Sequence, residues 1–116
     1  MPIVKTIYLH KLDKDVDFIV GKSAKENFEI IDAASDHHIW FHVKGCPSPH
    51  VIAYIEEKVD RKNMRYIVKQ GAIFCKQYSK YASVKNVEIL YTRVCNIHKA
   101  NMVGSVNIAN EKTVVI

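Results

Sequence analysis

The turn at residues 45–49 constrains the fold more than any other stretch of this sequence. It lies between two β-rich runs, "IWFHVK" at 39–44 and "HVIAYI" at 50–55. Pro47 and Pro49 lack the amide hydrogen that a sheet ladder needs, so they mark a connection between strands. Strands joined by so short a connection pair in antiparallel fashion. We therefore expect a hairpin here.

Other segments have strand patterns as well. The runs "TIYLHKL" and "VDFIVG" predict a hairpin with "DKDVD" as its turn. The runs "NVEILYTRV", "GSVNI" and "KTVVI" predict three further strands, the last two joined by the turn "ANEK". In "GSVNI" and the residue before it, Val103, Val106 and Ile108 fit half-buried strand positions.

Two stretches have the periodicity of helices. In the first, Ser23 and Glu26 form an S-x-x-E capping box, and Ala24, Phe28 and Ile31 are expected on its buried face. The second runs from residue 60 or 63 to about residue 81. Its inward stripe is Met64, Ile67, Val68, Gly71, Cys75 and Tyr78. We expect residues 1–116 to form one α+β domain, a mostly antiparallel β-sheet with two helices packed on it.

Composition restricts the partners and the compartment. The 116 residues carry 17 Lys and Arg against 12 Asp and Glu, a net charge of +5, which favours a polyanionic partner only if the charge is clustered. The 3 cysteines are widely spaced and predict neither a disulfide framework nor a zinc ribbon. No apolar run is long enough for membrane insertion, and the first residues do not resemble a signal peptide. A cytoplasmic protein is expected.

The longer helix is expected to carry a row of cations. These are Lys62, Arg65, Lys69, Lys76 and Lys80. They fall within an arc of roughly 60° opposite the apolar stripe and extend over about 30 Å. No acidic residue lies between positions 61 and 85 to neutralise them. Such a row could follow a phosphate backbone, and the alternative is a solvated outer face.

Alternation along the strand at 39–44 puts Trp40, His42 and Lys44 on one face. The alternate, apolar residues face the other way and are expected to pack under the helices. An indole, an imidazole and an ammonium group together predict a platform where bases stack and a cation meets phosphate. The alternative is that Trp40 belongs to the core and His42 is a satisfied polar group at the sheet edge.

Metal binding and catalysis have weaker support. His38, His42, Cys46 and His50 recur every four residues, a spacing that aligns ligands only on a helix. The prolines and β-rich flanks argue against a helix, and no orienting carboxylate accompanies a Cys46–His50 pair. The letters "GKS" at 21–23 lack the rest of a Walker motif, yet Lys22 at a helix start offers a site for one phosphate. We expect no metal, no cofactor and no catalytic residue.

Four blocks of the sequence resemble the NFACT-R domain, the RNA-binding module of NFACT proteins. They are "GKSAKEN", "IWFHVKG-PSPHVI", "YSKYASVKNVEILYT" and "GSV…KTVVI". The most specific element is W-x-H…P-x-x-H-V after G-K-x-A-x-x-N, and the resemblance runs from about residue 21 to residue 116. The matching positions are Gly21, Lys22, Ala24, Asn27, Trp40, His42, Pro47, His50, Val51, Ser79, Lys80, Gly104 and Val106. The family usually has Asp where this chain has His38, and glycine after the proline where it has Ser48 and Pro49.

The resemblance implies a non-catalytic module in stand-alone form, acting in translation or ribosome quality control. It implies that His42 and His50 are neighbours beside Lys22 and Lys44 and form an anion-binding corner. The expected ligand is structured RNA, either tRNA or ribosomal RNA, and DNA stays possible because phosphate contacts carry no sequence information. The alternative is a protein-interaction module that docks on a ribosome-associated or other acidic protein.

Overall fold

A computed structural model describes residues 1–100 and 105–116 of the chain. In chain order the elements are β1 Ile3–Leu9, β2 Lys14–Gly21, α1 Ala24–Ala33, β3 Ile39–Val43, β4 His50–Tyr54, α2 Arg61–Gln77, β5 Glu88–Arg93, the 3-10 turn Val94–Asn96, β6 Ile97–Lys99, β7 Val106–Ile108 and β8 Lys112–Val115. Six strands form one sheet in the order β1-β2-β4-β3-β5-β8, and β6 pairs with β7. All these pairs are antiparallel, so the expected α+β class is confirmed.

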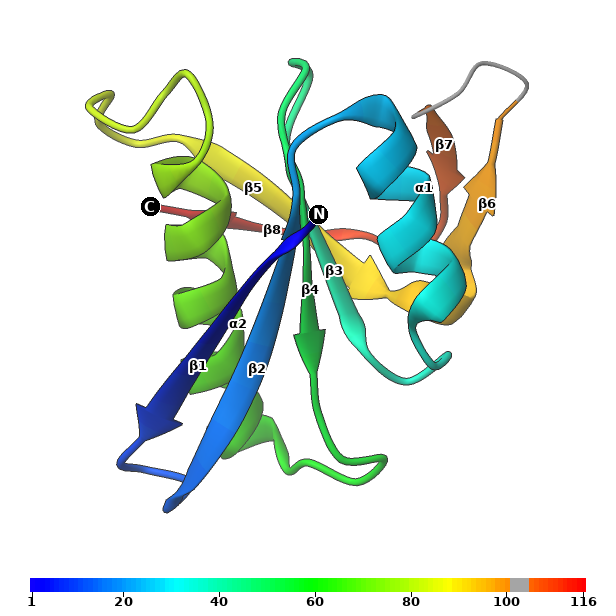
Figure 1. Ribbon diagram of the computed structural model, residues 1–116. Coiled ribbons are helices and arrows are strands. Elements are labelled where there is room, and N and C mark those ends of the chain that lie inside the picture. The colour runs from blue at the N-terminus through cyan, green and yellow to red at the C-terminus, as the bar shows by residue number, and fades with distance from the viewer. Residues whose placement is uncertain (101–104) are drawn as a thin grey trace.

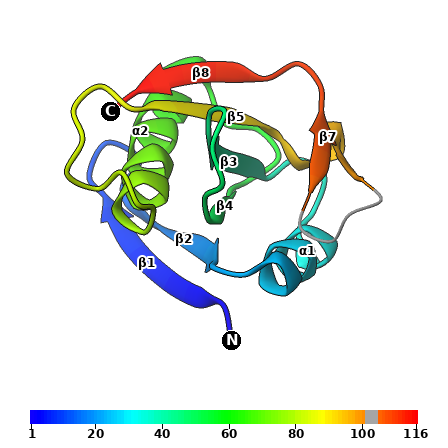
Figure 2. The ribbon, with the colours of Figure 1, turned by 90° about the horizontal axis from the view of Figure 1, so that it is seen from above.

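The two helices lie on opposite sides of the six-stranded sheet (Figures 1 and 2). Helix α2 covers the face that carries Phe41 and Val51. Helix α1 and the β6–β7 hairpin cover the face that carries Trp40 and Ile52. The expectation that both helices pack on the apolar face of the 39–44 strand, leaving the Trp40 face open, is therefore wrong. Because each face carries its own cluster of apolar side chains, each needs its own cover.

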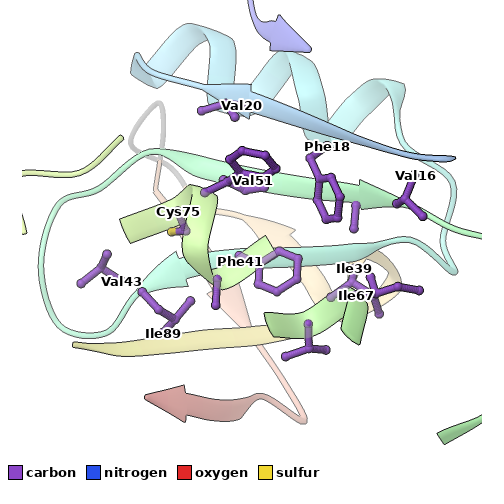
Figure 3. Close-up of a cluster of buried hydrophobic side chains, with 14 of the residues drawn as sticks. Val16, Phe18, Val20, Ile39, Phe41, Val43, Val51, Ile67, Cys75 and Ile89 are labelled. Carbon is purple, nitrogen blue, oxygen red and sulfur yellow. The ribbon is translucent and has the colours of Figure 1, made fainter. Parts of the chain in front are cut away.

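The larger of the two clusters fills the space between the sheet and α2 (Figure 3). Phe18, Phe41 and Val51 are fully buried there, and α2 contributes Ile67 and other side chains. Gly71 lets α2 approach the sheet closely, because a Cβ at this position would lie less than 3.0 Å from three atoms of the Phe41 ring. The stripe of apolar residues predicted for this helix is thus the side that faces the sheet.

The start of α1 follows the capping pattern with one difference. The Ser23 hydroxyl accepts a hydrogen bond from the Glu26 amide, as expected, but the Glu26 carboxylate accepts from the Lys22 amide and not from that of Ser23. The buried residues of the helix are Asn27, Ile30 and Ile31. Of the expected set only Ile31 is buried, since Ala24 is exposed and Phe28 is half-buried.

Three boundaries or pairings differ from the sequence predictions. The first turn lies at residues 10–13, where Asp13 has a φ of 53°, so it shares only Asp13 with the expected turn "DKDVD", and β2 already begins at Lys14. Helix α2 begins after its N-cap Asp60 and ends at Gln77, so Lys80 lies beyond it. The segment "GSVNI" does not pair with "KTVVI": β7 pairs with β6, a strand the sequence reading missed, and β8 pairs with β5. Val103 and Gly104 lie outside the described residues.

We predict that Gly71→Ala destabilises the protein, although alanine is the better helix former by about 1 kcal/mol. The Phe41 ring is fully buried and cannot move aside, so the extra methyl group overpacks the core at a cost of about 1–3 kcal/mol. Urea unfolding measures the free energy of unfolding. Gln70→Ala, at the neighbouring half-buried position, is the control and should change it by less than about 0.5 kcal/mol. A Gly71→Ala protein as stable as the parent would contradict the close approach.

Candidate nucleic-acid interface

A pocket of about 730 Å³ opens where the start of α1, the turn between β3 and β4, and the end of α2 come together. These three parts lie at the upper end of the molecule in Figure 1, and Figure 2 looks down on them. Strand β7 completes the wall. The described lining residues are Lys22, Ser23, Ala24, Asn27, Trp40, His42, Gly45, Cys46, Pro47, Ser48, Pro49, His50, Tyr78, Lys80, Leu90, Ser105, Val106 and Ile108. No carboxylate is among them.

Two histidines and a tryptophan form a connected group beside the pocket. The Trp40 indole Nε1 donates a hydrogen bond to Nδ1 of His50 at 3.1 Å. The Trp40 and His42 rings are stacked with centroids 5.6 Å apart, and the His42 and His50 rings meet edge to face at 5.1 Å. The two histidines are therefore neighbours across the hairpin, as the resemblance implied.

The hydrogen bond from Trp40 determines which ring nitrogen of His50 carries the hydrogen. Since Nδ1 of His50 accepts, the neutral ring carries its hydrogen on Nε2, and that nitrogen is a donor. Burial, and next the neighbouring His42, lower the pKa of His50 to about 3. Burial also lowers the pKa of His42. At neutral pH the pair is uncharged, so the two histidines contribute no positive charge to the corner.

Trp40 is 1% exposed and packs under α1. Its rings are covered, so the expected platform of exposed aromatic surface is wrong for this residue, and the alternative that it belongs to the core is confirmed. The cause is the α1 and β6–β7 layer, which closes the sheet face that the strand alternation left open. Trp40 instead acts on the pocket through the nitrogen that it directs at His50.

Asn27 joins α1 to the hairpin. Its Oδ1 accepts a hydrogen bond from the main-chain amide of His50 at 3.2 Å, and its side chain is 7% exposed. Gly21, which pairs with His50 in the sheet, leaves room for this contact: a Cβ there would lie 2.6 Å from Asn27 Oδ1. The glycine of the "GKS" letters thus allows close packing, and its φ is not positive.

Not all of the cations predicted near the hairpin line the pocket. Lys22 and Lys80 line the pocket, and the Lys22 ammonium lies 5.8 Å from the centroid of the Tyr78 ring. Lys44 is not among the described lining residues, and its ammonium is 3.3 Å from the Glu88 carboxylate in an exposed ion pair. Of the expected corner, His42, His50 and Lys22 line the pocket and Lys44 does not, whereas Lys80 does.

Most of the cations predicted along α2 are free to contact a partner. Lys62, Arg65 and Lys69 are exposed, and none forms an ion pair with any described residue. Lys76 is half-buried and donates to the main-chain oxygen of Ile116 at 3.0 Å, which ties α2 to the end of the chain. Lys80 lies beyond the end of the helix and lines the pocket.

Sequence reasoning missed Asn27 and Tyr78 as lining residues, whereas Lys22 and Ser23 belong to the phosphate site expected at the start of α1. The signal for Asn27 was its place as the last residue of the G-K-x-A-x-x-N block. Its position on α1 gave no indication that its side chain reaches the hairpin. The helical spacing of Tyr78 predicts this residue in the buried stripe of the long helix. It is half-buried at the helix end, where its ring faces Lys22.

His38 stands where the resembling family usually has Asp. Its Nδ1 accepts the main-chain amide of Ile55 at 3.0 Å, and its ring stacks on Tyr54 at 4.3 Å between centroids. Burial lowers the pKa of His38, which keeps that nitrogen an acceptor. His38 therefore supplies an acceptor for a main-chain amide, which a carboxylate could also supply, and it is not one of the described residues that line the pocket.

Within residues 1–100 and 105–116, no three His, Cys, Asp or Glu side chains gather as a metal site would require. The same part of the chain has no helix that is long and apolar enough to cross a membrane.

The His50 pKa predicts that stability falls in mild acid. The folded protein keeps His50 neutral down to about pH 3, whereas the unfolded chain takes up a proton near pH 6.5. Stability is therefore full above pH 6.5 and is lost as the pH falls towards 3. Between pH 7 and pH 5 the free energy of unfolding should drop by about 2 kcal/mol through this group.

Urea unfolding at both pH values tests this. His50→Gln should remove the share of the pH dependence that comes from His50 and leave the smaller shares of His38 and His42, whose pKa values burial also lowers. His10→Gln, at an exposed turn, should keep the whole pH dependence. A His50→Gln protein with the full acid loss would show that another group is responsible.

Three comparisons with known proteins bear on identity. A search of curated proteins gave no match. The C-terminal part of the fibronectin/fibrinogen-binding protein from Streptococcus suis has a similar structure, with a TM-score of 0.80 and 23% identity over 99% of this chain. The match spans 44% of that chain, and at this identity it supports the fold alone. The family model described as "NFACT protein RNA binding domain" matches residues 5–110. Because that match covers most of the sequence, the chain belongs to the NFACT RNA-binding domain family.

Proposed function

We propose that this protein is a non-catalytic module that binds structured RNA, either tRNA or ribosomal RNA, in the cytoplasm in the context of translation or ribosome quality control. The observation that carries the proposal is a pocket that Lys22 and Lys80 line and that has no carboxylate among its described residues. Exposed cations on α2, at Lys62, Arg65 and Lys69, are a second basic feature.

The geometry suits a nucleic acid better than a small anion. Helix α2 has 17 residues and is about 25 Å long, enough to meet several successive phosphates. Lys62, Arg65 and Lys69 hold no ion pair with described residues, so binding a phosphate does not require breaking one. Lys76 contributes less, because it already donates to Ile116.

A protein-interaction module is the second candidate, since an acidic protein surface would meet the same exposed cations. The pocket favours RNA over this alternative. It combines neutral donors, two ammonium groups and apolar walls, which together match a nucleotide more closely than they match a carboxylate side chain.

We predict that Arg65→Glu combined with Lys69→Glu weakens the binding of a tRNA-sized RNA at least about tenfold and lowers the slope of log affinity against log salt by about 2. The reason is the loss of about two phosphate contacts. Filter binding over about a fourfold range of ionic strength, from roughly 50 to roughly 200 mM salt, measures both quantities.

The control for this prediction reverses the same number of charges elsewhere. Lys5→Glu with Lys11→Glu, on β1 and its following turn, gives the same net charge and should change affinity much less. An equal loss in both double variants would mean that only net charge matters. Undetectable RNA binding at low salt, together with a protein partner that survives nuclease treatment, would favour the protein-interaction module. Competition by duplex DNA of equal length decides between RNA and DNA.

A further inference from the structure

Two hydrogen-bond donors on buried side chains at the pocket have no acceptor among the described residues. His50 is 2% exposed and Asn27 is 7% exposed, and each has one polar atom engaged: Nδ1 of His50 by Trp40, and Oδ1 of Asn27 by the His50 amide. Nε2 of His50 and Nδ2 of Asn27 have no hydrogen-bond partner in the described part of the chain. Both residues line the pocket.

Both side chains are held in place at the pocket. Among the described residues, no fully buried side-chain nitrogen or oxygen lacks a hydrogen-bond partner, and His50 and Asn27 both line the pocket, so the pocket is the space that their remaining nitrogens can reach. Both atoms are fixed as donors, since their companion atoms already accept hydrogen bonds.

The chemistry of the pocket changes from its floor to its rim. Its floor offers the neutral donors of His50 and Asn27, and its walls include the apolar side chains of Leu90 and Ile108. Its exposed rim carries the ammonium group of Lys22, which precedes the first residues of α1, and that of Lys80, which follows the end of α2. The start of a helix favours negative charge.

We infer that the pocket binds one unpaired nucleotide of an RNA, with its phosphate at the rim between Lys22 and Lys80 and its base against the donors of His50 and Asn27. This inference rests on the proposed function and names the part of the RNA that is recognised. The volume of about 730 Å³ lies in the range of small-molecule sites, about 300–1,000 Å³. A flat ring with acceptor atoms at its edge matches apolar walls above two donors, and a bare phosphate leaves those walls uncovered.

Nucleoside 5′-monophosphates, uridine and inorganic phosphate are the probes for the pocket itself. Trp40 is the only tryptophan and donates to His50, so its fluorescence reports on the floor, and NMR of the His50 ring nitrogens reports on Nε2 directly. At least one monophosphate should shift both signals and bind about tenfold more tightly than uridine or phosphate. Phosphate binding as tightly as every nucleotide, or no change at His50, would overturn the inference.

Asn27→Asp is a matched variant, because it keeps the oxygen that accepts the His50 amide and replaces the donor nitrogen by oxygen. It should lower monophosphate affinity at least about tenfold while the urea midpoint stays near that of the parent. Lys22→Gln with Lys80→Gln, both at exposed positions, tests the rim and keeps the test valid if Asn27→Asp impairs folding. Lys44→Gln, on the same hairpin but outside the pocket, is the control and should bind normally.

RNA hairpins with and without a short single-stranded extension separate this inference from the proposed function. The extended hairpin should bind about tenfold more tightly than the blunt one, and Asn27→Asp should abolish the difference. Equal, salt-dependent affinity for both would overturn the inference and leave the proposed RNA binding intact. If neither hairpin binds, the proposed function itself is contradicted.

Discussion

The hydrogen bond from the Trp40 indole to His50 is the contact on which the candidate site depends. It joins two neighbouring strands on the face covered by α1, and it decides which nitrogen of His50 carries the hydrogen. An uncharged imidazole with a single free donor is the result. A charged His50 could not accept from Trp40, so this hydrogen bond requires the neutral imidazole that the pocket presents.

Around that contact the fold brings three distant segments together. Asn27 arrives from α1, the histidines come from the hairpin, and Lys80 follows the end of α2. Each is held by an ordinary structural device: the cap formed by Ser23, the antiparallel register of β3 and β4, and the end of α2 at Gln77. The core provides the rigid support, because α2 packs directly on Phe41 through Gly71.

Sequence patterns predicted most of the elements because each depends on local chemistry. The prolines marked the hairpin turn, and Ser23 with Glu26 marked the start of α1. Which strands pair with one another was harder to predict. The pattern of "GSVNI" indicates a strand but does not say that its partner is the three-residue β6, since pairing depends on where the chain returns in space. For the same reason the sequence did not predict that α1 and the β6–β7 hairpin cover Trp40.

The sequence alone determined the α+β class, the basic face of the long helix, and the family resemblance, because periodicity, charge order and motif letters are properties of the chain itself. Only the tertiary structure decided that Trp40 is buried, that the histidines are neutral at pH 7, and that Lys80, and not Lys44, lines the pocket. Burial and ionisation depend on which surfaces meet. Those contacts arise from segments that lie far apart in the sequence.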